Sequence, residues 1–199
     1  MSSNSILKKT LESISLKIKR GLSSYYNDAD GTIVHIINIR DIQQGRVILN
    51  TVESVKVKET LALENSTIKE NDLILTIKGN TFKSAVADKS LNGFVISANL
   101  IAFTLDKEIN PHIISAYLNS VHGQKELQAR AGGAVQKALN MKSLYDLEIP
   151  ILPINKQQVF SRYLSLSQEY DEFLVKEQEL RKKIINSMFI DLEVEKWDY

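Results

Sequence analysis

Hydrophobic and polar residues alternate in short runs along the first three-quarters of the chain. Apolar and β-branched residues dominate residues 32–39, 46–49, 72–78, 84–87 and 94–103. Turn-forming pairs such as Asp-Gly, Gly-Asn and Asn-Gly bound several of these runs, so each run predicts a strand. Because no regular helical pattern separates them, the sequence favours a mixed, mainly antiparallel sheet over a doubly wound one.

A helical pattern begins at Pro111. Asn110 before it is a good helix cap, and proline is well tolerated as the first helical residue. The apolar residues that recur at helical spacing are Ile113, Ile114, Tyr117, Leu118 and Val121. Gly132 and Gly133 stop the pattern, which predicts one helix before them. A turn over residues 142–147 and an extended exit over residues 148–153 complete the globular part.

From Asn155 onward the chain contains no proline or glycine. Its apolar residues follow a heptad-like seam: Val159, Tyr163, Leu166, Tyr170, Phe173, Leu180 and Ile184. Glu177 interrupts one position of this seam. The pattern predicts a helix of about 30 residues, which is far longer than the globular average. Such a helix either packs on its own domain or forms a coiled coil with another chain or a second copy; the length of the seam favours the coiled coil.

These patterns predict an α+β fold with a mixed, mainly antiparallel sheet, helices and one long C-terminal coiled-coil helix. The expected organisation is a globular domain over residues 1–153, the long helix over residues 154–190 and a tail over residues 191–199.

Charge is nearly balanced over the 199 residues, with 25 basic and 24 acidic residues. Residues 1–60 hold nine basic and six acidic residues, whereas residues 156–199 hold seven and nine. We therefore expect an anionic ligand to meet the first 155 residues. The absence of cysteine excludes a disulfide scaffold, a cysteine zinc site and a cysteine nucleophile. A polar N-terminus and the lack of a long apolar run predict a cytoplasmic protein without a membrane partner.

Catalytic motifs are missing from the sequence. His35, His112 and His122 form no metal-binding pair, and no phosphate-binding loop, Gly-x-Gly-x-x-Gly or Gly-x-Ser-x-Gly motif occurs. The Asp/Glu-x-Lys tripeptide common in nuclease metal sites is absent, as is the Pro-Pro pair of adenine and cytosine N-methyltransferases. We therefore predict no catalytic residues, no metal ligands and no cofactor, and no enzymatic activity of the chain alone.

Residues 92–160 carry an ordered series of short motifs. The series comprises residues 92–100, 109–120, 123–124, 131–140 and 144–150, followed by Pro153 and Gln157. Gly21, Gly45 and residues 41–42 and 70–74 fit the same pattern upstream. This order resembles the target recognition domain of the specificity subunit of type I restriction–modification enzymes, over about residues 6–190. The resemblance implies a non-catalytic DNA-recognition subunit that guides a methyltransferase subunit and, in some systems, an endonuclease subunit. S-adenosylmethionine, ATP and magnesium would belong to those partners.

Members of that family usually carry two recognition domains separated by two long helices. This sequence shows one of each and no internal repeat, so it resembles a half-length specificity subunit. The resemblance implies that two copies form a homodimer through antiparallel long helices, using the seam residues named above. Such a dimer would read double-stranded DNA at a symmetric site, as two half-sites around an unread spacer.

Two acid-free stretches, residues 73–87 and 127–145, suit contact with DNA. The candidate DNA-binding residues in them are Lys78, Asn80, Thr81, Lys83, Ser84, Arg130, Gln136, Lys137 and Asn140. Asn and Gln pair with adenine and Arg with guanine, while Lys holds phosphates. Residues 40–46, with Gln43 and Gln44, are a third candidate. A structural interpretation stays open, because polar loops of any soluble domain contain such residues and Gly132 and Gly133 also serve to end a helix.

Three alternatives remain beside DNA recognition. The first is a coiled-coil interaction module without a DNA role, which near-neutral charge favours and the ordered motifs oppose. The second is a stand-alone nuclease or methyltransferase, which the missing motifs oppose. The third is a truncated, inactive remnant of a longer subunit.

Overall fold

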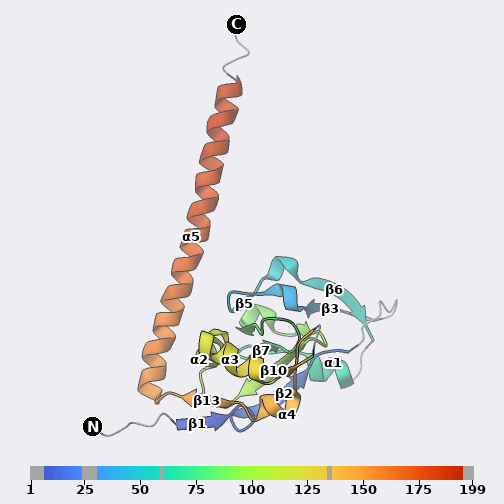
Figure 1. The fold of residues 1–199 in the computed structure, drawn as a ribbon. Helices are drawn as coiled ribbons and strands as arrows, with labels where there is room; N and C mark the ends of the chain where they lie inside the picture. Colours follow the sequence, from blue (N-terminus) through green and yellow to red (C-terminus); the bar gives the residue numbers. More distant parts are fainter. Residues whose placement is uncertain (1–6, 24–30, 59–60, 134–135, 195–199) are drawn as a thin grey trace, which may run out of the picture. The chain divides into compact units, whose positions relative to one another are not determined.

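The computed structural model describes residues 7–23, 31–58, 61–133 and 136–194. The chain divides into two compact units, Met1–Gln157 and Gln158–Tyr199. The first is the globular unit, and the described residues of the second, 158–194, form the rest of one long helix (Figure 1). The strands are β1 (Leu7–Thr10), β2 (Ser15–Arg20), β3 (Thr32–Ile37), β4 (Ile42–Gln43), β5 (Arg46–Val47), β6 (Glu53–Val57), β7 (Leu73–Thr76), β8 (Ser84–Val86), β9 (Val95–Ile96), β10 (Leu100–Leu105), β11 (Ala131–Gly132), β12 (Ala138–Leu139) and β13 (Glu148–Ile151). The α-helices are α1 (Leu61–Ser66), α2 (Pro111–Asn119), α3 (Val121–Ala129), α4 (Met141–Tyr145) and α5 (Ile154–Val194), and the 3-10 turns are η1 (Ile39–Asp41), η2 (Leu49–Thr51) and η3 (Lys89–Leu91).

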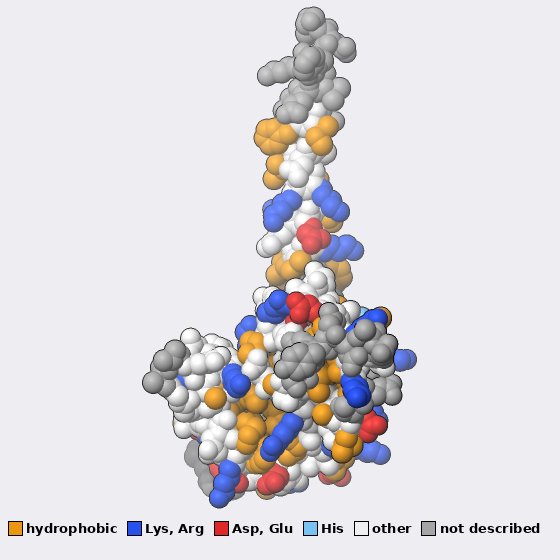
Figure 2. Space-filling view, turned by 90° about the vertical axis from the view of Figure 1, so that its right-hand side faces the viewer, with side chains coloured by type: hydrophobic (Ala, Val, Ile, Leu, Met, Phe, Trp, Pro, Cys, Tyr) orange, Lys and Arg blue, Asp and Glu red, His pale blue; other side chains and the backbone are white. Residues whose placement is uncertain are grey.

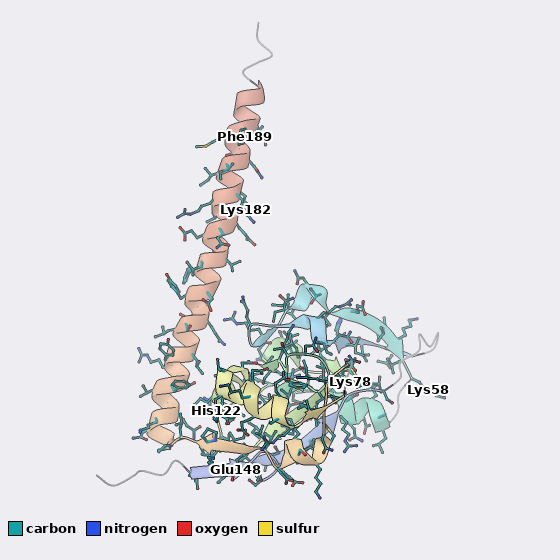
Figure 3. All side chains as sticks on the ribbon, viewed as in Figure 1. Lys58, Lys78, His122, Glu148, Lys182 and Phe189 are labelled. Carbon is teal, nitrogen blue, oxygen red and sulfur yellow. The ribbon has the colours of Figure 1, made fainter. Side chains whose placement is uncertain are left out.

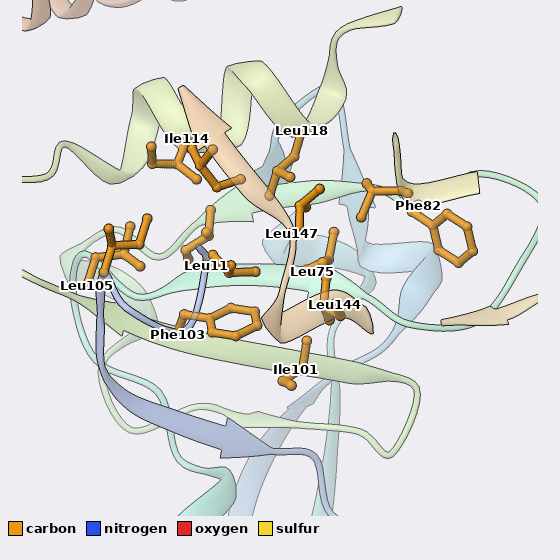
Figure 4. Close-up of a cluster of buried hydrophobic side chains, with 14 of the residues drawn as sticks. Leu11, Leu75, Phe82, Ile101, Phe103, Leu105, Ile114, Leu118, Leu144 and Leu147 are labelled. Atoms are coloured by element: carbon orange, nitrogen blue, oxygen red, sulfur yellow. The ribbon is translucent and has the colours of Figure 1, made fainter. Parts of the chain in front are cut away.

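The main sheet has the order β2-β10-β7-β8, and all of its pairs are antiparallel. Its central strands β7 and β10 are apolar on both faces because both faces are covered. Leu75, Ile101 and Phe103 join one buried cluster with Ile114 and Leu118 of α2 (Figure 4). The alternate residues of the same strands join a second buried cluster on the opposite face: Ile74, Leu100 and Ala102.

A second sheet has the order β6-β3-β9, in which β3 and β9 are parallel. The remaining named strands form antiparallel pairs, and β1 pairs with β13 from Leu7 opposite Ile151 to Thr10 opposite Glu148. The predicted mixed, mainly antiparallel sheet with helices is confirmed. The exit segment, which was expected to be only extended, is a paired strand.

Two predicted elements are each split in the structure. The predicted strand over residues 94–103 is two strands in different sheets, because Leu100 N–H bonds to Ser97 O and turns the chain between them. The predicted single helix after Pro111 breaks at Ser120. The hydroxyl of Ser120 caps α3 by accepting a bond from Gly123 N–H, while its own N–H ends α2 on Tyr117 O.

One buried ion pair fastens the edge strand β2 to the core. Lys19 Nζ lies 2.5 Å from Asp72 Oδ2, and both side chains are almost fully buried. Asp72 also accepts bonds from Lys69 N–H and from the Thr104 hydroxyl. Because both charges are paired and the carboxylate is further hydrogen-bonded, the polar cluster is compatible with burial.

Helix α5 is 41 residues long, longer than its sequence predicted. Its first turn belongs to the globular unit, where the buried Gln157 amide donates to Leu152 O and Glu108 O and accepts from Asn110 N–H. Across the described residues, no helix is both long and apolar enough to cross a membrane.

Candidate nucleic-acid interface

The structure joins the two acid-free stretches that the sequence singled out. Gly79 N–H donates to Lys137 O at 2.9 Å, and Leu139 N–H donates to Ile77 O at the same distance. Between these bonds, Lys78 and Ala138 form an isolated antiparallel bridge. The chain following β7 and the β11–β12 hairpin, which are about 60 residues apart in the sequence, thus form one continuous backbone surface.

Side chains of α3 reinforce this junction. Gln128 Nε2 donates to Asn80 O at 2.7 Å, and Gln128 Oε1 accepts a 2.8 Å bond from Lys137 Nζ. Gln128 itself belongs to the second stretch, so its bond to Asn80 O is a further link between the two stretches.

Six of the nine candidate residues gather at this junction, and we call them the lysine surface: Lys78, Asn80, Thr81, Lys83, Gln136 and Lys137. Four of them are exposed, whereas Lys78 and Lys83 are half-buried. Figure 3 labels Lys78 among the side chains of the globular unit. The surface contributes three lysines and three neutral hydrogen-bonding side chains, with no carboxylate of its own.

The other three candidates have structural contacts. Ser84 is fully buried in β8, so its hydroxyl is not on the surface. Arg130 donates from Nη1 to Glu126 Oε2 at 2.8 Å and from Nε to Ser143 O at 3.0 Å. The Asn140 side chain caps α4 by accepting a bond from Ser143 N–H. We therefore do not include these three residues in the lysine surface.

The apolar seam of α5 lies on exposed positions within its own unit. The seven predicted dimerisation residues are between 51% and 73% exposed. Further exposed apolar residues widen the stripe towards the C-terminal end: Ile185, Met188, Phe189 and Ile190. Figure 2 shows hydrophobic side chains gathered near that end of the helix, above a belt of Lys and Arg, and Figure 3 shows Lys182 and Phe189 projecting from it.

Within the described ranges, no three His, Asp or Glu side chains gather as potential metal ligands. Burial, and then the Glu126 carboxylate, raise the pKa of the Tyr117 phenol on α2, which therefore stays neutral at physiological pH.

A family model for the type I restriction modification DNA specificity domain matches residues 8–184. The chain belongs to this family. It is 23% identical over 164 residues to the EcoBI type I restriction enzyme specificity subunit of Escherichia coli, a match that covers 78% of this chain and 35% of that protein. The predicted resemblance to specificity subunits of type I restriction–modification enzymes is confirmed at the level of the family.

Solved structures share the fold of this specificity domain. The HsdS subunit from Thermoanaerobacter tengcongensis aligns with a TM-score of 0.61 and 15% identity, over 89% of this chain and 45% of that one. The type I S subunit from M. genitalium aligns with a TM-score of 0.60 and 21% identity, over 92% and 45%. A third structure comes from work on complex assembly and conformational transition of the type I R-M system. It aligns with a TM-score of 0.64 and 17% identity, over 89% of this chain and 46% of that one. The chain spans less than half the length of each of these relatives.

Several motif residues of the specificity domain prove to hold the main chain. The Asn119 side chain accepts from Ser84 N–H at 2.9 Å and donates to Ser84 O at 2.8 Å. Gln124 accepts from Phe82 N–H and donates to Phe82 O and Leu118 O. These amides fix the segment that carries Lys83. Both residues lie within the family motif, but their types alone did not indicate this structural role.

Gly123 has a packing reason for its place in the same motif. A Cβ at this position would lie 2.1 Å from Tyr117 O, at the corner between α2 and α3. Only glycine permits this approach. The close corner brings Gln124 to the main chain of residue 82.

Proposed function

We propose that this chain recognises double-stranded DNA as part of a type I restriction–modification assembly, with the lysine surface as its DNA contact. The observation that carries the proposal is the pair of backbone bonds that unites the two acid-free stretches into one surface. Family membership supports DNA as the ligand.

The chemistry of the lysine surface suits a duplex. Lys78, Lys83 and Lys137 supply point charges for phosphates, which position a protein without reading sequence. The amides of Asn80 and Gln136 have the donor and acceptor pair that matches the major-groove edge of adenine. Because a hydrogen-bonded junction holds these groups, little ordering is left to be done when DNA binds.

The test is the salt dependence of DNA binding, measured by fluorescence anisotropy with a mixed-sequence duplex. Replacing Lys78, Lys83 and Lys137 together by alanine should weaken binding and reduce the slope of log K against log salt by about 0.9 per lost phosphate contact. The matched control replaces three exposed lysines elsewhere in the globular unit: Lys9, Lys89 and Lys107. An equal loss in both triple variants would contradict the assignment of the surface. A wild-type chain that binds no DNA would favour the alternative of an interaction module without a DNA role.

We further propose that two copies pair through α5. A seam that is more than half exposed over seven positions is a large apolar area for a helix in water, and heptad spacing matches a second helix. In a symmetric pair, each copy would present one recognition unit, so the combined site on DNA would be two symmetric half-sites.

The position of Glu177 favours an antiparallel pair. In a parallel pair in register, the two copies of Glu177 would face each other within the seam, where like charges are unfavourable. In an antiparallel pair centred on Val175, the facing residues are Leu166 and Ile184, Tyr170 and Leu180, and Phe173 and Glu177. Glu169 then lies near Lys183 of the second copy, which pairs opposite charges.

The oligomeric test compares two double variants by light scattering. Leu166→Glu with Phe173→Glu places charges in the seam and should give a folded monomer. Ser165→Glu with Asn186→Glu adds the same charge on the opposite face of the helix and should leave a dimer. Sequencing of DNA selected by the wild-type dimer should then show a symmetric split motif. A wild-type chain that stays monomeric at micromolar concentration would contradict the proposed dimer and, with it, the prediction of a symmetric motif.

In this assignment the chain acts in the cytoplasm and has no chemistry of its own. It would direct a methyltransferase subunit, and an endonuclease subunit where one exists, to the site. S-adenosylmethionine, ATP and magnesium would be held by those subunits.

A further inference from the structure

The β4–β5 hairpin ends in a two-residue turn of unusual composition. Ile42 pairs with Val47 and Gln43 pairs with Arg46, which leaves Gln44 and Gly45 as the turn. Their φ angles are +48° and +79°, so both are in the left-handed region required by a type I′ turn. Asn, Asp and Gly are favoured at the first position of such turns, and glutamine is not among them.

Glutamine at this position is therefore a poor choice for turn stability. Non-glycine residues with positive φ are uncommon, and those that lack a short Asn or Asp side chain are more so. Strained residues of this kind tend to persist where the side chain has a use.

The hairpin is rigidly anchored at its base. Ile42 and Asp41 are fully buried. Asp41 accepts Asn38 N–H on its carboxylate at 2.7 Å and Ile48 N–H on its carbonyl at 2.8 Å. Gln43 and Gln44 at the tip are exposed, so a fixed scaffold presents two adjacent amides to solvent.

The tip adjoins the segment that carries the lysine surface. Strands β4 and β5 pack against β8, and a Cβ at Gly45 would lie 3.7 Å from Asn119 Nδ2. That same Asn119 amide is bonded to the main chain of Ser84, and Lys83 is the next residue. The hairpin therefore lies near the segment that carries Lys83, one residue of the lysine surface.

We propose that the β4–β5 hairpin is a second base-reading element and that Gln44 recognises an adenine in the major groove. The inference rests on the proposed DNA-recognition function. A two-stranded ribbon fits the major groove, and a glutamine amide can bond to adenine N6 and N7 together. In the described part of the chain Gln44 makes no hydrogen bond, whereas Gln43 donates to Arg40 O at 3.2 Å. Gln44 is thus the amide that is ready for a base.

The experiment compares Gln44→Gly and Gln44→Asn with wild type, by sequencing DNA selected from a random library and by thermal melting. Both replacements suit the turn better than glutamine, so the melting temperature should stay equal or rise. Glycine removes the amide and asparagine is one methylene shorter, so preference for one adenine in each half-site should fall about ten-fold. Asn50→Ala, an exposed amide shortly after the hairpin, is the control that should keep the wild-type motif.

The outcomes separate the inference from the function on which it rests. If wild type selects a motif and Gln44→Gly selects the same motif with equal preference, the hairpin does not read bases and the DNA-recognition function stands. A lost preference for a base other than adenine would overturn the adenine assignment. A wild-type chain that selects no motif would overturn the proposed function itself.

Discussion

The globular unit and helix α5 use the same apolar residue types in opposite ways. Leu73, Ile74 and Leu75 in β7 are completely buried, whereas Leu166, Phe173 and Leu180 on α5 are more than half exposed. In the first region the apolar side chains stabilise the fold of one chain. In the second they lie at exposed positions of the helix. The contrast teaches that a hydrophobic pattern marks residues suited to burial. Whether the same unit buries them depends on the fold.

The largest expected effect compares two phenylalanines. Phe103→Ala in the core should destabilise the globular unit by about 3–5 kcal/mol, because it leaves a cavity between the main sheet and α2. Phe173→Ala on α5 should leave the unfolding midpoint of that unit unchanged and weaken only self-association. Urea unfolding followed by circular dichroism, together with sedimentation, measures both quantities. A similar loss of globular stability in both variants would mean that Phe173, like Phe103, contributes to the stability of the globular unit.

A smaller difference is expected between two glutamines. Gln124→Ala leaves the buried backbone groups that it holds without partners, so the globular unit should lose about 1–3 kcal/mol of stability. Gln178→Ala, at an exposed position of α5, should change stability by less than about 0.5 kcal/mol. Thermal melting of both variants provides the comparison. Equal melting temperatures would show that the Gln124 amide has no structural role.

Replacing the charge in the seam sharpens the view of α5. Glu177→Leu completes the apolar stripe, so the proposed dimer should bind about ten-fold more tightly. The substitution also removes the ion pair between Glu177 and Arg181 at 2.6 Å, but this pair is worth only about 0.3–0.5 kcal/mol. Glu179→Leu, on the opposite face, should not tighten the dimer. Sedimentation equilibrium gives both dissociation constants. Weaker association of Glu177→Leu would indicate that Glu177 makes a favourable contact across the interface.

The sequence predicted the elements whose surroundings are simple. Strand β7 is covered on both faces, so it is a continuous apolar run and was predicted. Strand β2 was missed because it is rich in lysine, and one of those lysines, Lys19, is buried by pairing with Asp72, which no periodicity reveals. The break at Ser120 was missed because apolar spacing continues through it; Ser120 itself, a good helix cap, was the available signal.

For the proposed site, the sequence singles out two stretches but does not show that they adjoin. The lack of acidic residues identified both stretches, because charge is a property of the sequence. Their junction depends on backbone bonds such as Gly79 to Lys137, which leave no trace in side-chain chemistry. Ser84 was included for its polarity, yet it occupies a strand with Ala85 and Val86 and is buried with them. A serine inside an apolar run is better interpreted as part of the strand.

The smallest expected effect concerns pH: the stability of the globular unit should depend on His112, and self-association through α5 should not. Partial desolvation by its neighbours lowers the pKa of His112, in the first turn of α2, below its ordinary value of 6.5, although the side chain still reaches solvent. The unfolded chain therefore binds a proton before the folded chain does, and stability should fall as the pH drops below 6.5, down to the folded pKa. His112→Gln should remove this dependence, which is small because the His112 side chain is exposed. Helix α5 contains no histidine. The pH dependence of self-association should therefore be the same in wild type and in His112→Gln. Thermal melting and sedimentation from pH 5 to 8 measure the stability of the globular unit and self-association separately. A wild-type melting temperature that rises on acidification would contradict this mechanism.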